Sequence, residues 1–194
     1  FRALAARLAP AQKLAHLRAI TLTGEAAFAS DAALFRRHTR EDCILVNQLG
    51  ATENDLIAQY VVRHTGRLPS TPILPVGRCP DGVSVRIERD DGSAAAEDEI
   101  GSIVVAGANV SPGYWMRPDL DAASFTNDPA LPGVRLYRGG DQGRIDADGN
   151  LHFIGRRGSR IKLNGISIDL MEIEAALAGC PGVVRAAVVA TSSD

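Results

Sequence analysis

The sequence predicts an α/β fold that leads into a small antiparallel β subdomain and then into the start of a small α+β subdomain. In the first third, a strand at residues 20–22, a helix at 31–37 and a strand at 44–46 follow one another. This order predicts two parallel strands joined by a right-handed helical crossover. Alternating apolar residues at 83–88 predict a half-buried strand in the middle, and helical spacing resumes after residue 169.

The composition is ordinary for a globular protein with a core of its own. Of the 194 residues, 45% are apolar and 23% are charged, and the net charge is -2. This charge excludes a broad basic surface for nucleic acid or an anionic membrane, and no apolar run is long enough to span a bilayer. The three cysteines are far apart and form no Cys-x-x-Cys pair, which predicts buried thiols in a reducing, cytoplasmic compartment.

The first segment, residues 1–68, is predicted to form the α/β part. Ser30 is placed to cap the helix at 31–37. The first strand is followed by a turn at 23–26 and the second by a predicted polar loop at 47–53. Because parallel strands run in one direction, both loops leave the carboxyl ends of neighbouring strands, where open α/β sheets bind ligands.

The second segment, residues 69–154, is predicted to be rich in β structure. Its prolines break up helices, and a further strand is expected at 100–106. The sequence Asp-Ala-Asp-Gly-Asn at 146–150 predicts a hairpin turn. Trp115, next to Tyr114, is expected to pack against other side chains rather than to stack on a base.

The last segments are predicted to be a hinge at 155–160 and an incomplete lid subdomain at 161–194. The hinge sequence Gly-Arg-Arg-Gly-Ser-Arg combines three guanidinium groups with two glycines, which suits a joint that pivots and grips a phosphate or a ribose. Further on, Asp169 is expected to cap a helix with Glu172 three residues later, and residues 183–189 to form a closing strand.

Four motifs carry a family resemblance. Three follow in order in the last third: Tyr137-Arg138-Gly139-Gly140-Asp141, then Gly155-Arg156 through Lys162 to Gly165, then Leu170-Met171-Glu172-Ile173-Glu174. The fourth is Asn47-Gln48-Leu49-Gly50-Ala51-Thr52-Glu53. Together they resemble the adenylate-forming enzymes, most closely the adenylation domains of non-ribosomal peptide synthetases, with acyl- and aryl-CoA ligases and luciferases as further members. The resemblance implies the end of a large adenylate-forming α/β core followed by the start of its lid.

The resemblance implies a site for ATP or AMP and for Mg²⁺. Asn47 and Leu49 take the positions that frame adenine in the family, although Leu49 replaces a stacking aromatic residue. Thr52 matches the hydroxyl that meets the α-phosphate, and Glu53 matches the carboxylate that holds the metal, so both are expected to be catalytic. Carboxylate and hydroxyl oxygens are ligands that Mg²⁺ prefers.

The other nucleotide-binding positions implied by the resemblance lie in two separate segments. Gly24, Glu25 and Ala26 match a turn whose backbone borders the adenine and acyl pockets. Asp141 and Arg156 match residues that reach the ribose, and a carboxylate accepts hydrogen bonds from ribose hydroxyls in other nucleotide sites. Asp141 also has a plainer interpretation, as a turn aspartate after two glycines.

The lid positions implied by the resemblance serve a second step. Gly158 replaces the polar residue on which the hinge turns in the family. Lys162 matches a lysine expected to be catalytic in thioester formation, or else it is an exposed strand lysine. Gly165 matches a glycine that lines the tunnel for the pantetheine arm, and Asn164 replaces an arginine beside it.

The implied function is part of an ATP-dependent adenylation domain. It would activate a carboxylate substrate, an amino acid, as acyl-AMP and transfer it to the phosphopantetheine thiol of a carrier-protein domain. Two alternatives stay open: a stand-alone acyl- or aryl-CoA ligase, which uses CoA, and a non-catalytic split or degenerate module used for docking or nucleotide binding. The chain starts with Phe1 and lacks the family's phosphate loop and second catalytic lysine, so we expect a piece of a longer protein that is inactive alone.

Overall fold

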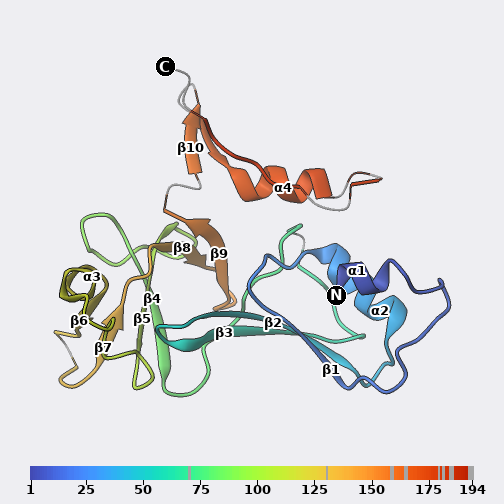
Figure 1. Ribbon diagram of the computed structural model, residues 1–194, viewed down its shortest axis with the longest axis horizontal. Coiled ribbons are helices and arrows are strands. Elements are labelled where there is room, and N and C mark those ends of the chain that lie inside the picture. Colours follow the sequence, from blue (N-terminus) through green and yellow to red (C-terminus); the bar gives the residue numbers. More distant parts are fainter. Residues whose placement is uncertain are drawn as a thin grey trace.

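The computed structural model describes residues 1–69, 71–129, 131–157, 160–163, 166–178, 180, 182–183 and 186–191. It is a mixed α/β structure, as predicted, with two antiparallel-rich sheets side by side and the end of the chain above them (Figure 1). The helices are α1 (Arg2–Ala5), α2 (Ala29–His38), α3 (Pro118–Ser124) and α4 (Leu170–Ala178).

The first sheet has three strands in the order β1 (Ala19–Leu22), β2 (Ile44–Ala51) and β3 (Asp55–Val62). β1 and β2 are parallel, which confirms the predicted crossover through α2, and Leu22 lies opposite Asn47. β2 then turns back into the antiparallel β3. One face is covered by α2, where Phe35, fully buried, contacts the apolar side chains of β2 and β3.

The loop predicted at 47–53 was wrong. β2 continues to Ala51, and a tight turn at Thr52 leads straight into β3. The prediction gave weight to the polar residues and to Gly50, which are poor strand formers by themselves. Pairing with the whole length of β3 supplies hydrogen bonds that override this local preference, with a register shift at Leu49 and Gly50 where the pairing is irregular.

The predicted cap of α2 was also wrong. The helix begins at Ala29 with Phe28 in the cap position, so Ser30 lies inside the first turn. Asp31 takes the capping role, because its Oδ2 accepts the backbone N–H of Phe28 at 2.8 Å. Asp31 is buried and also accepts two hydrogen bonds from the Arg2 guanidinium, each at 2.6 Å. This contact ties α1 to the start of α2.

The second sheet has six strands, in the order β6-β7-β5-β8-β9 with β4 on the other side of part of β5. Its members are β4 (Val83–Glu88), β5 (Gly101–Gly107), β6 (Phe125–Asn127), β7 (Arg135–Tyr137), β8 (Asp141–Ile145) and β9 (Leu151–Arg156). All its pairs are antiparallel. The hairpin turn predicted at 146–150 is confirmed, since Asp146 and Asn150 close it by a backbone hydrogen bond of 3.0 Å.

A shared core joins the two sheets. Ile57 and Ala58 of β3 pack with Val105 of β5 and Leu151 of β9, and all four are buried. Gly77 lies between the sheets with φ +84°, and a Cβ there would collide with the backbone of Gln59. Only glycine therefore permits this close approach. The packing holds the end of β2 against the six-stranded sheet.

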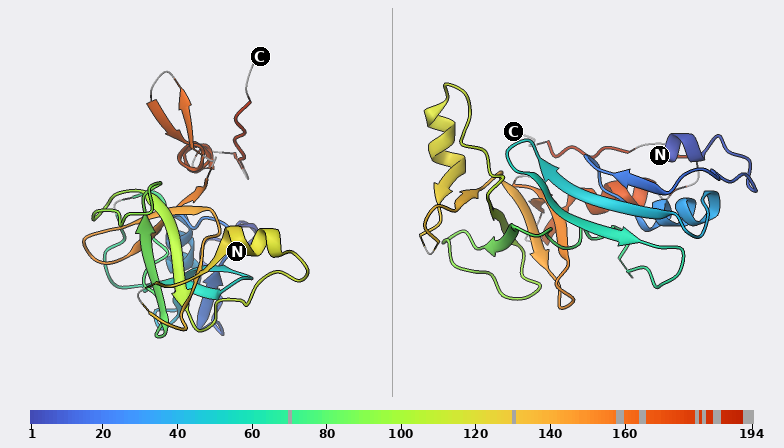
Figure 2. Two further views of the ribbon diagram at one scale, coloured as in Figure 1. Left: turned by 90° about the vertical axis from the view of Figure 1, so that its left-hand side faces the viewer. Right: turned by 90° about the horizontal axis from the view of Figure 1, so that it is seen from below.

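The remaining elements, β10 (Arg160–Leu163), β11 (Ile166–Asp169) and α4, project from the two sheets (Figures 1 and 2). β10 and β11 form an antiparallel pair. The strand predicted at 183–189 was wrong for the residues described there, none of which is in a strand. Val188 instead contacts α4, where its N–H donates to Glu174 Oε1 at 2.9 Å.

Two expectations about exposure need correction. Cys43 is buried and Cys79 is half-buried, but Cys180 is exposed, so buried thiols describe only part of the set. Trp115 does not pack inside, since 90% of its surface is exposed. Within the described ranges, every helix is too short or too polar to traverse a lipid bilayer.

Candidate functional site

The turn between β2 and β3 presents Thr52 and Glu53 at the edge of the six-stranded sheet. The turn is tight, and Asp55 takes a positive φ of 55° to enter β3. Thr52 is exposed and Glu53 is partly buried. The Glu53 carbonyl accepts the Ser111 N–H at 2.7 Å, and its Oε1 accepts the Tyr114 hydroxyl at 2.7 Å. The carboxylate is therefore held in one direction from the loop that follows β5.

Asp141 and Arg156 form the second part of the site. They are register partners on β8 and β9, and the Arg156 Nε donates to Asp141 Oδ1 at 3.2 Å. Asp141 is mostly enclosed, with 15% of its side chain exposed, whereas 77% of the Arg156 side chain is exposed. The pair thus combines an enclosed acceptor of hydrogen bonds with a cation that reaches solvent.

Electrostatics link the two parts. Burial raises the pKa of the Asp141 carboxyl, the Arg156 guanidinium lowers it, and the negative charge of Glu53 raises it again. The pKa of the Tyr137 hydroxyl is raised well above its ordinary value, first by burial and then by the charge of Glu53. The structure thus pairs Asp141 with Arg156 directly, and Glu53 acts on Asp141 through its charge.

Arg157 anchors the start of the predicted hinge. Its Nη2 donates to Asp90 Oδ1 at 3.1 Å and to Ser102 Oγ at 2.9 Å, and its backbone N–H donates to the Gly140 carbonyl at 2.7 Å. The chain is therefore attached to the six-stranded sheet as far as Arg157. Gly158 and Gly165, the predicted pivot and tunnel glycines, lie outside the described residues. Lys162 lies in β10 opposite Ser167.

The two adenine-framing positions lie inside β2. Asn47 is buried, and its Nδ2 donates to the Pro75 carbonyl at 2.9 Å. Leu49 packs against the core shared by the two sheets. At about 3.3 Å per residue, roughly 13 Å of strand separates Asn47 from Ala51. Neither residue has a described contact with Asp141 or Glu53, so their role toward adenine stays a prediction.

The predicted turn at Gly24, Glu25 and Ala26 follows β1, whose last residue pairs with Asn47. Gly24 takes a positive φ of 82°. Arg2 holds this turn, because its Nη2 donates to the Ala26 carbonyl at 2.7 Å and its Nη1 lies 3.9 Å from Glu25 Oε2. The turn thus begins beside Asn47 in the middle of β2.

The sequence interpretation gave no site role to Tyr114 or Asn54, and it named Tyr137 only as part of a motif. The hydroxyl of Tyr114 contacts Glu53, and Tyr137 lies close to both. Asn54, next to Glu53, is completely buried, yet neither its Nδ2 nor its Oδ1 has a hydrogen-bond partner among the described residues. Tyr114 is a single residue without a spacing pattern, and only the folded loop shows its contact with Glu53.

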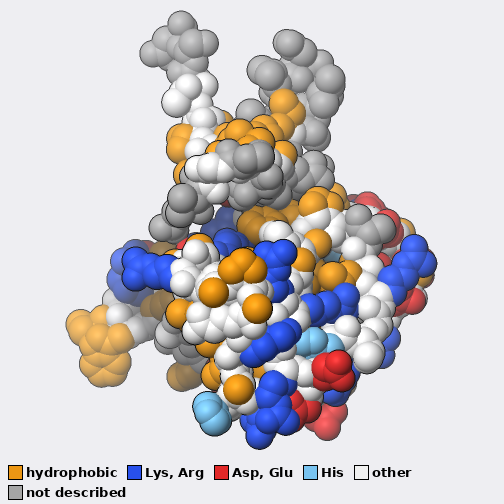
Figure 3. Space-filling view, turned by 90° about the vertical axis from the view of Figure 1, so that its right-hand side faces the viewer, with side chains coloured by type: hydrophobic (Ala, Val, Ile, Leu, Met, Phe, Trp, Pro, Cys, Tyr) orange, Lys and Arg blue, Asp and Glu red, His pale blue; other side chains and the backbone are white. Residues whose placement is uncertain are grey.

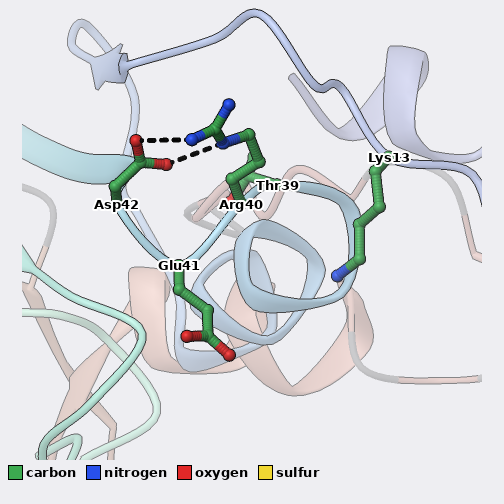
Figure 4. A pocket seen from close by; sticks show the side chains of 5 residues that line it. All are labelled: Lys13, Thr39, Arg40, Glu41 and Asp42. Carbon is green, nitrogen blue, oxygen red and sulfur yellow. Dashed lines mark hydrogen bonds and ion pairs between the residues drawn. The ribbon is translucent and has the colours of Figure 1, made fainter.

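A hollow of about 460 Å³ in the described surface lies away from this site. Lys13, Thr39, Arg40, Glu41 and Asp42 line it (Figure 4). This hollow lies just before β2, at the opposite end of that strand from Glu53. Within it, Arg40 donates to Asp42 through Nε to Oδ1 at 2.9 Å and through Nη2 to Oδ2 at 3.0 Å. A smaller hollow of about 190 Å³ lies beside Arg36, Arg63 and Arg67, on a face rich in Lys and Arg (Figure 3). Neither hollow contains a predicted site residue.

The Glu53 turn fits a magnesium ion of the kind that bridges protein and phosphate. No group of three or more His, Cys, Asp or Glu side chains able to hold a metal is found in the part of the chain that the structure describes. Mg²⁺ does not need such a group, since it is usually bound by one or two carboxylates together with substrate phosphates and water. Glu53, beside the hydroxyl-bearing Thr52, supplies that kind of ligand.

Comparison with known proteins defines the class. A family model described as "AMP-binding enzyme" matches residues 1–115, so the chain belongs to the AMP-binding enzyme family. Among its relatives are gramicidin S synthase 2 from Brevibacillus brevis, 33% identical over 161 residues, and tyrocidine synthase 2 from Brevibacillus parabrevis, 36% identical over 150 residues. These alignments cover 82% and 77% of the chain but only 4% of each relative.

Solved structures agree. PA1221, a peptide synthetase protein containing adenylation and PCP domains, is 32% identical with a TM-score of 0.65, over 91% of this chain and 36% of its own. NpsA from Klebsiella oxytoca, in complex with 3-hydroxyanthranilyl-AMSN, is 25% identical with a TM-score of 0.73, again over 91% and 36%. The chain therefore has the sequence and fold of part of a peptide synthetase adenylation domain.

Proposed function

We propose that this chain forms the ribose- and metal-binding side of an ATP-dependent adenylation domain. The domain activates a carboxylate substrate, an amino acid, as acyl-AMP and then transfers the acyl group to the phosphopantetheine thiol of a carrier domain. The observation that carries the proposal is the Asp141–Arg156 pair, 3.2 Å apart, next to a Glu53 whose charge raises the pKa of Asp141. Family membership supports the same reaction class.

Asp141 acts as the ribose acceptor. Its carboxylate accepts hydrogen bonds from the two ribose hydroxyls, which is the usual role of an acidic residue in a nucleotide site. The role requires an ionised carboxylate, although burial raises its pKa. Arg156 counters this effect by its charge and its hydrogen bond, and its exposed guanidinium remains near enough to meet the sugar or the phosphate.

Thr52 and Glu53 act at the phosphates. The Glu53 carboxylate would hold Mg²⁺, and the Thr52 hydroxyl would donate to an α-phosphate oxygen. The ion would supply positive charge that offsets the negative charge of the phosphates. Thr52 is exposed at the tip of a tight turn, so its hydroxyl is accessible to a ligand. The backbone of the turn is fixed by the Ser111 N–H, which donates to the Glu53 carbonyl.

The thioester-forming step uses the end of the chain. Lys162 and Gly165 serve this step after the lid turns about the hinge at Gly158. The anchoring of Arg157 to Asp90 and Ser102 supports a pivot that begins beyond it. PA1221, which contains an adenylation and a PCP domain, supports a carrier domain as the partner. The need for ATP supports a cytoplasmic location.

The test is ATP–pyrophosphate exchange in the full-length protein with Asp141→Ala. Loss of two charged hydrogen bonds to the ribose is expected to reduce exchange about 100-fold or more, as bonds to charged groups contribute about 1.5–3 kcal/mol each. Asp148→Ala is the matched control, because Asp148 is an exposed aspartate on the same β8–β9 hairpin. Exchange at the wild-type rate in Asp141→Ala would refute the ribose role.

A further inference from the structure

We infer that Tyr114 is a positioning residue that directs the Glu53 carboxylate toward a divalent cation. The inference rests on the metal role proposed above for Glu53 and deepens it. Its basis is the hydrogen bond of 2.7 Å from the Tyr114 hydroxyl to Glu53 Oε1. The bond joins the loop after β5 to the turn between β2 and β3, so it forms only when the two sheets pack together.

The loop after β5 holds the Glu53 turn at three points. The Ser111 N–H donates to the Glu53 carbonyl at 2.7 Å, and Asn109 Nδ2 donates to the Asn54 carbonyl at 2.5 Å. These two bonds fix the backbone of the turn, and the Tyr114 hydroxyl fixes the direction of the side chain. A glutamate has several rotatable bonds, so a fixed backbone alone would leave its carboxylate free to rotate.

Tyr114 is itself firmly held. Its backbone N–H donates to Asp121 Oδ1 of α3 at 2.6 Å. Gly113, with φ +146°, permits this contact, because a Cβ would collide with the Asp121 carboxylate. The Tyr114 ring meets Phe125 edge to face, with centroids 5.3 Å apart. Backbone and ring are thus both anchored, which a residue that orients another side chain requires.

The hydrogen bond between the Tyr114 hydroxyl and Glu53 is of the kind that orients a metal-binding carboxylate without contacting the metal. A carboxylate has two oxygens, and a neutral hydroxyl that occupies Oε1 leaves the negative charge in place for a cation. Hydrogen bonds of this kind orient metal ligands, and their loss costs roughly 10- to 100-fold in metal affinity. Glu53 also affects Tyr114. The hydrogen bond to its carboxylate is the main cause that raises the pKa of the Tyr114 hydroxyl.

The experiment measures ATP binding by calorimetry at a series of Mg²⁺ concentrations, with the full-length protein. Tyr114→Phe removes one hydroxyl and keeps the ring, so the thermal unfolding midpoint should stay close to the wild-type value. We expect the Mg²⁺ concentration at half-effect to rise roughly tenfold or more. Tyr60→Phe, a tyrosine in β3 without contact to Glu53, is the matched control and should leave it unchanged.

A second readout needs no nucleotide turnover. Trp115 follows Tyr114 directly and is 90% exposed, so the fluorescence that Trp115→Phe removes from the full-length protein reports on this loop. In the presence of ATP, Mg²⁺ should change that fluorescence with the same half-effect concentration as in calorimetry. Tyr114→Phe should shift the fluorescence curve and the calorimetric curve to higher Mg²⁺ by the same factor. A purely structural role for the hydroxyl would lower the unfolding midpoint and leave the Mg²⁺ dependence unchanged.

Glu53→Gln distinguishes the positioning role of Tyr114 from the metal-binding role of Glu53. If it raises the Mg²⁺ requirement while Tyr114→Phe does not, the positioning role is overturned and the metal role of Glu53 stands. If Glu53→Gln leaves the Mg²⁺ requirement unchanged, the metal role fails and the inference fails with it. A wild-type protein that shows no saturable ATP binding would overturn the proposed function itself.

Discussion

Arg156 faces Asp141 across the β8–β9 hairpin, with its Nε 3.2 Å from Oδ1, and this contact lowers the pKa of a carboxyl that burial raises. Removal of the guanidinium in Arg156→Ala takes away both causes that lower the pKa, its charge and its hydrogen bond. The pKa of Asp141 should therefore rise, which NMR titration of the side-chain carboxyl measures directly. The acid side of the exchange-versus-pH profile should move to higher pH, since the ribose role needs the ionised form.

Arg117→Ala is the control for this prediction. Arg117 is another exposed arginine paired with an aspartate, Asp119 at 2.7 Å, and it lies outside the site. It should leave the titration of Asp141 unchanged. An Asp141 pKa that stays the same or falls in Arg156→Ala would contradict the assigned cause.

The buried amides of Asn54 and Asn47 should respond in opposite ways to leucine. Asn54 is completely buried without a hydrogen-bond partner among the described residues, so Asn54→Leu removes a desolvated polar group and should raise the free energy of unfolding by about 1 kcal/mol. Asn47 donates to the Pro75 carbonyl at 2.9 Å, so Asn47→Leu leaves this carbonyl unpaired and should lower it by about 1–3 kcal/mol. Urea denaturation measures both, and a destabilised Asn54→Leu would show that the amide has a partner in solution.

Glu88 should be a key residue for the stability of the six-stranded sheet. Its carboxylate, nearly buried, accepts hydrogen bonds from Arg86 at 2.8 Å and from Arg138 at 3.0 and 3.1 Å. Glu88→Ala leaves two partly exposed guanidinium groups without this partner and should lower the free energy of unfolding by about 1–3 kcal/mol. Asp119→Ala, which breaks an exposed pair, should have no measurable effect in the same denaturation experiment.

Lys162→Ala should separate the two half-reactions of the full-length protein. We expect ATP–pyrophosphate exchange near the wild-type rate and slower loading of a holo carrier domain, because the lysine is proposed to act in thioester formation. Equal loss in both assays would contradict this role. Efficient transfer to free CoA in place of the carrier thiol would instead identify an acyl-CoA ligase.

Much of the fold was accessible from the sequence, because local and tertiary preferences agree there. The β1–α2–β2 crossover and the Asp146–Asn150 turn follow from apolar spacing and turn chemistry. The errors lie where tertiary contacts decide. Pairing with β3 extends β2 through residues that favour a loop, and Asp31 rather than Ser30 caps α2 because Arg2 fixes its carboxylate.

The site was accessible only in part. The motifs of a family resemblance predicted that Asp141, Arg156 and Glu53 lie close together. The structure pairs Asp141 with Arg156, and the common nucleotide site of all three stays a prediction. The contact between Tyr114 and Glu53 had no sequence signal, because a single tyrosine in a loop gives no periodicity to interpret. The buried Asn54 likewise shows itself only through its surroundings.

Arg156 and Arg157 are neighbours in the chain but are bound to different places, the first to Asp141 and the second to Asp90, Ser102 and the Gly140 carbonyl. Any strain transmitted backwards from β10 reaches Arg157 before it reaches Arg156. The contacts of Arg157 thus hold the chain on the six-stranded sheet between Arg156 and β10. If Asp141 and Arg156 bind a ribose as proposed, a movement of β10 would have to break these contacts before it displaced Arg156.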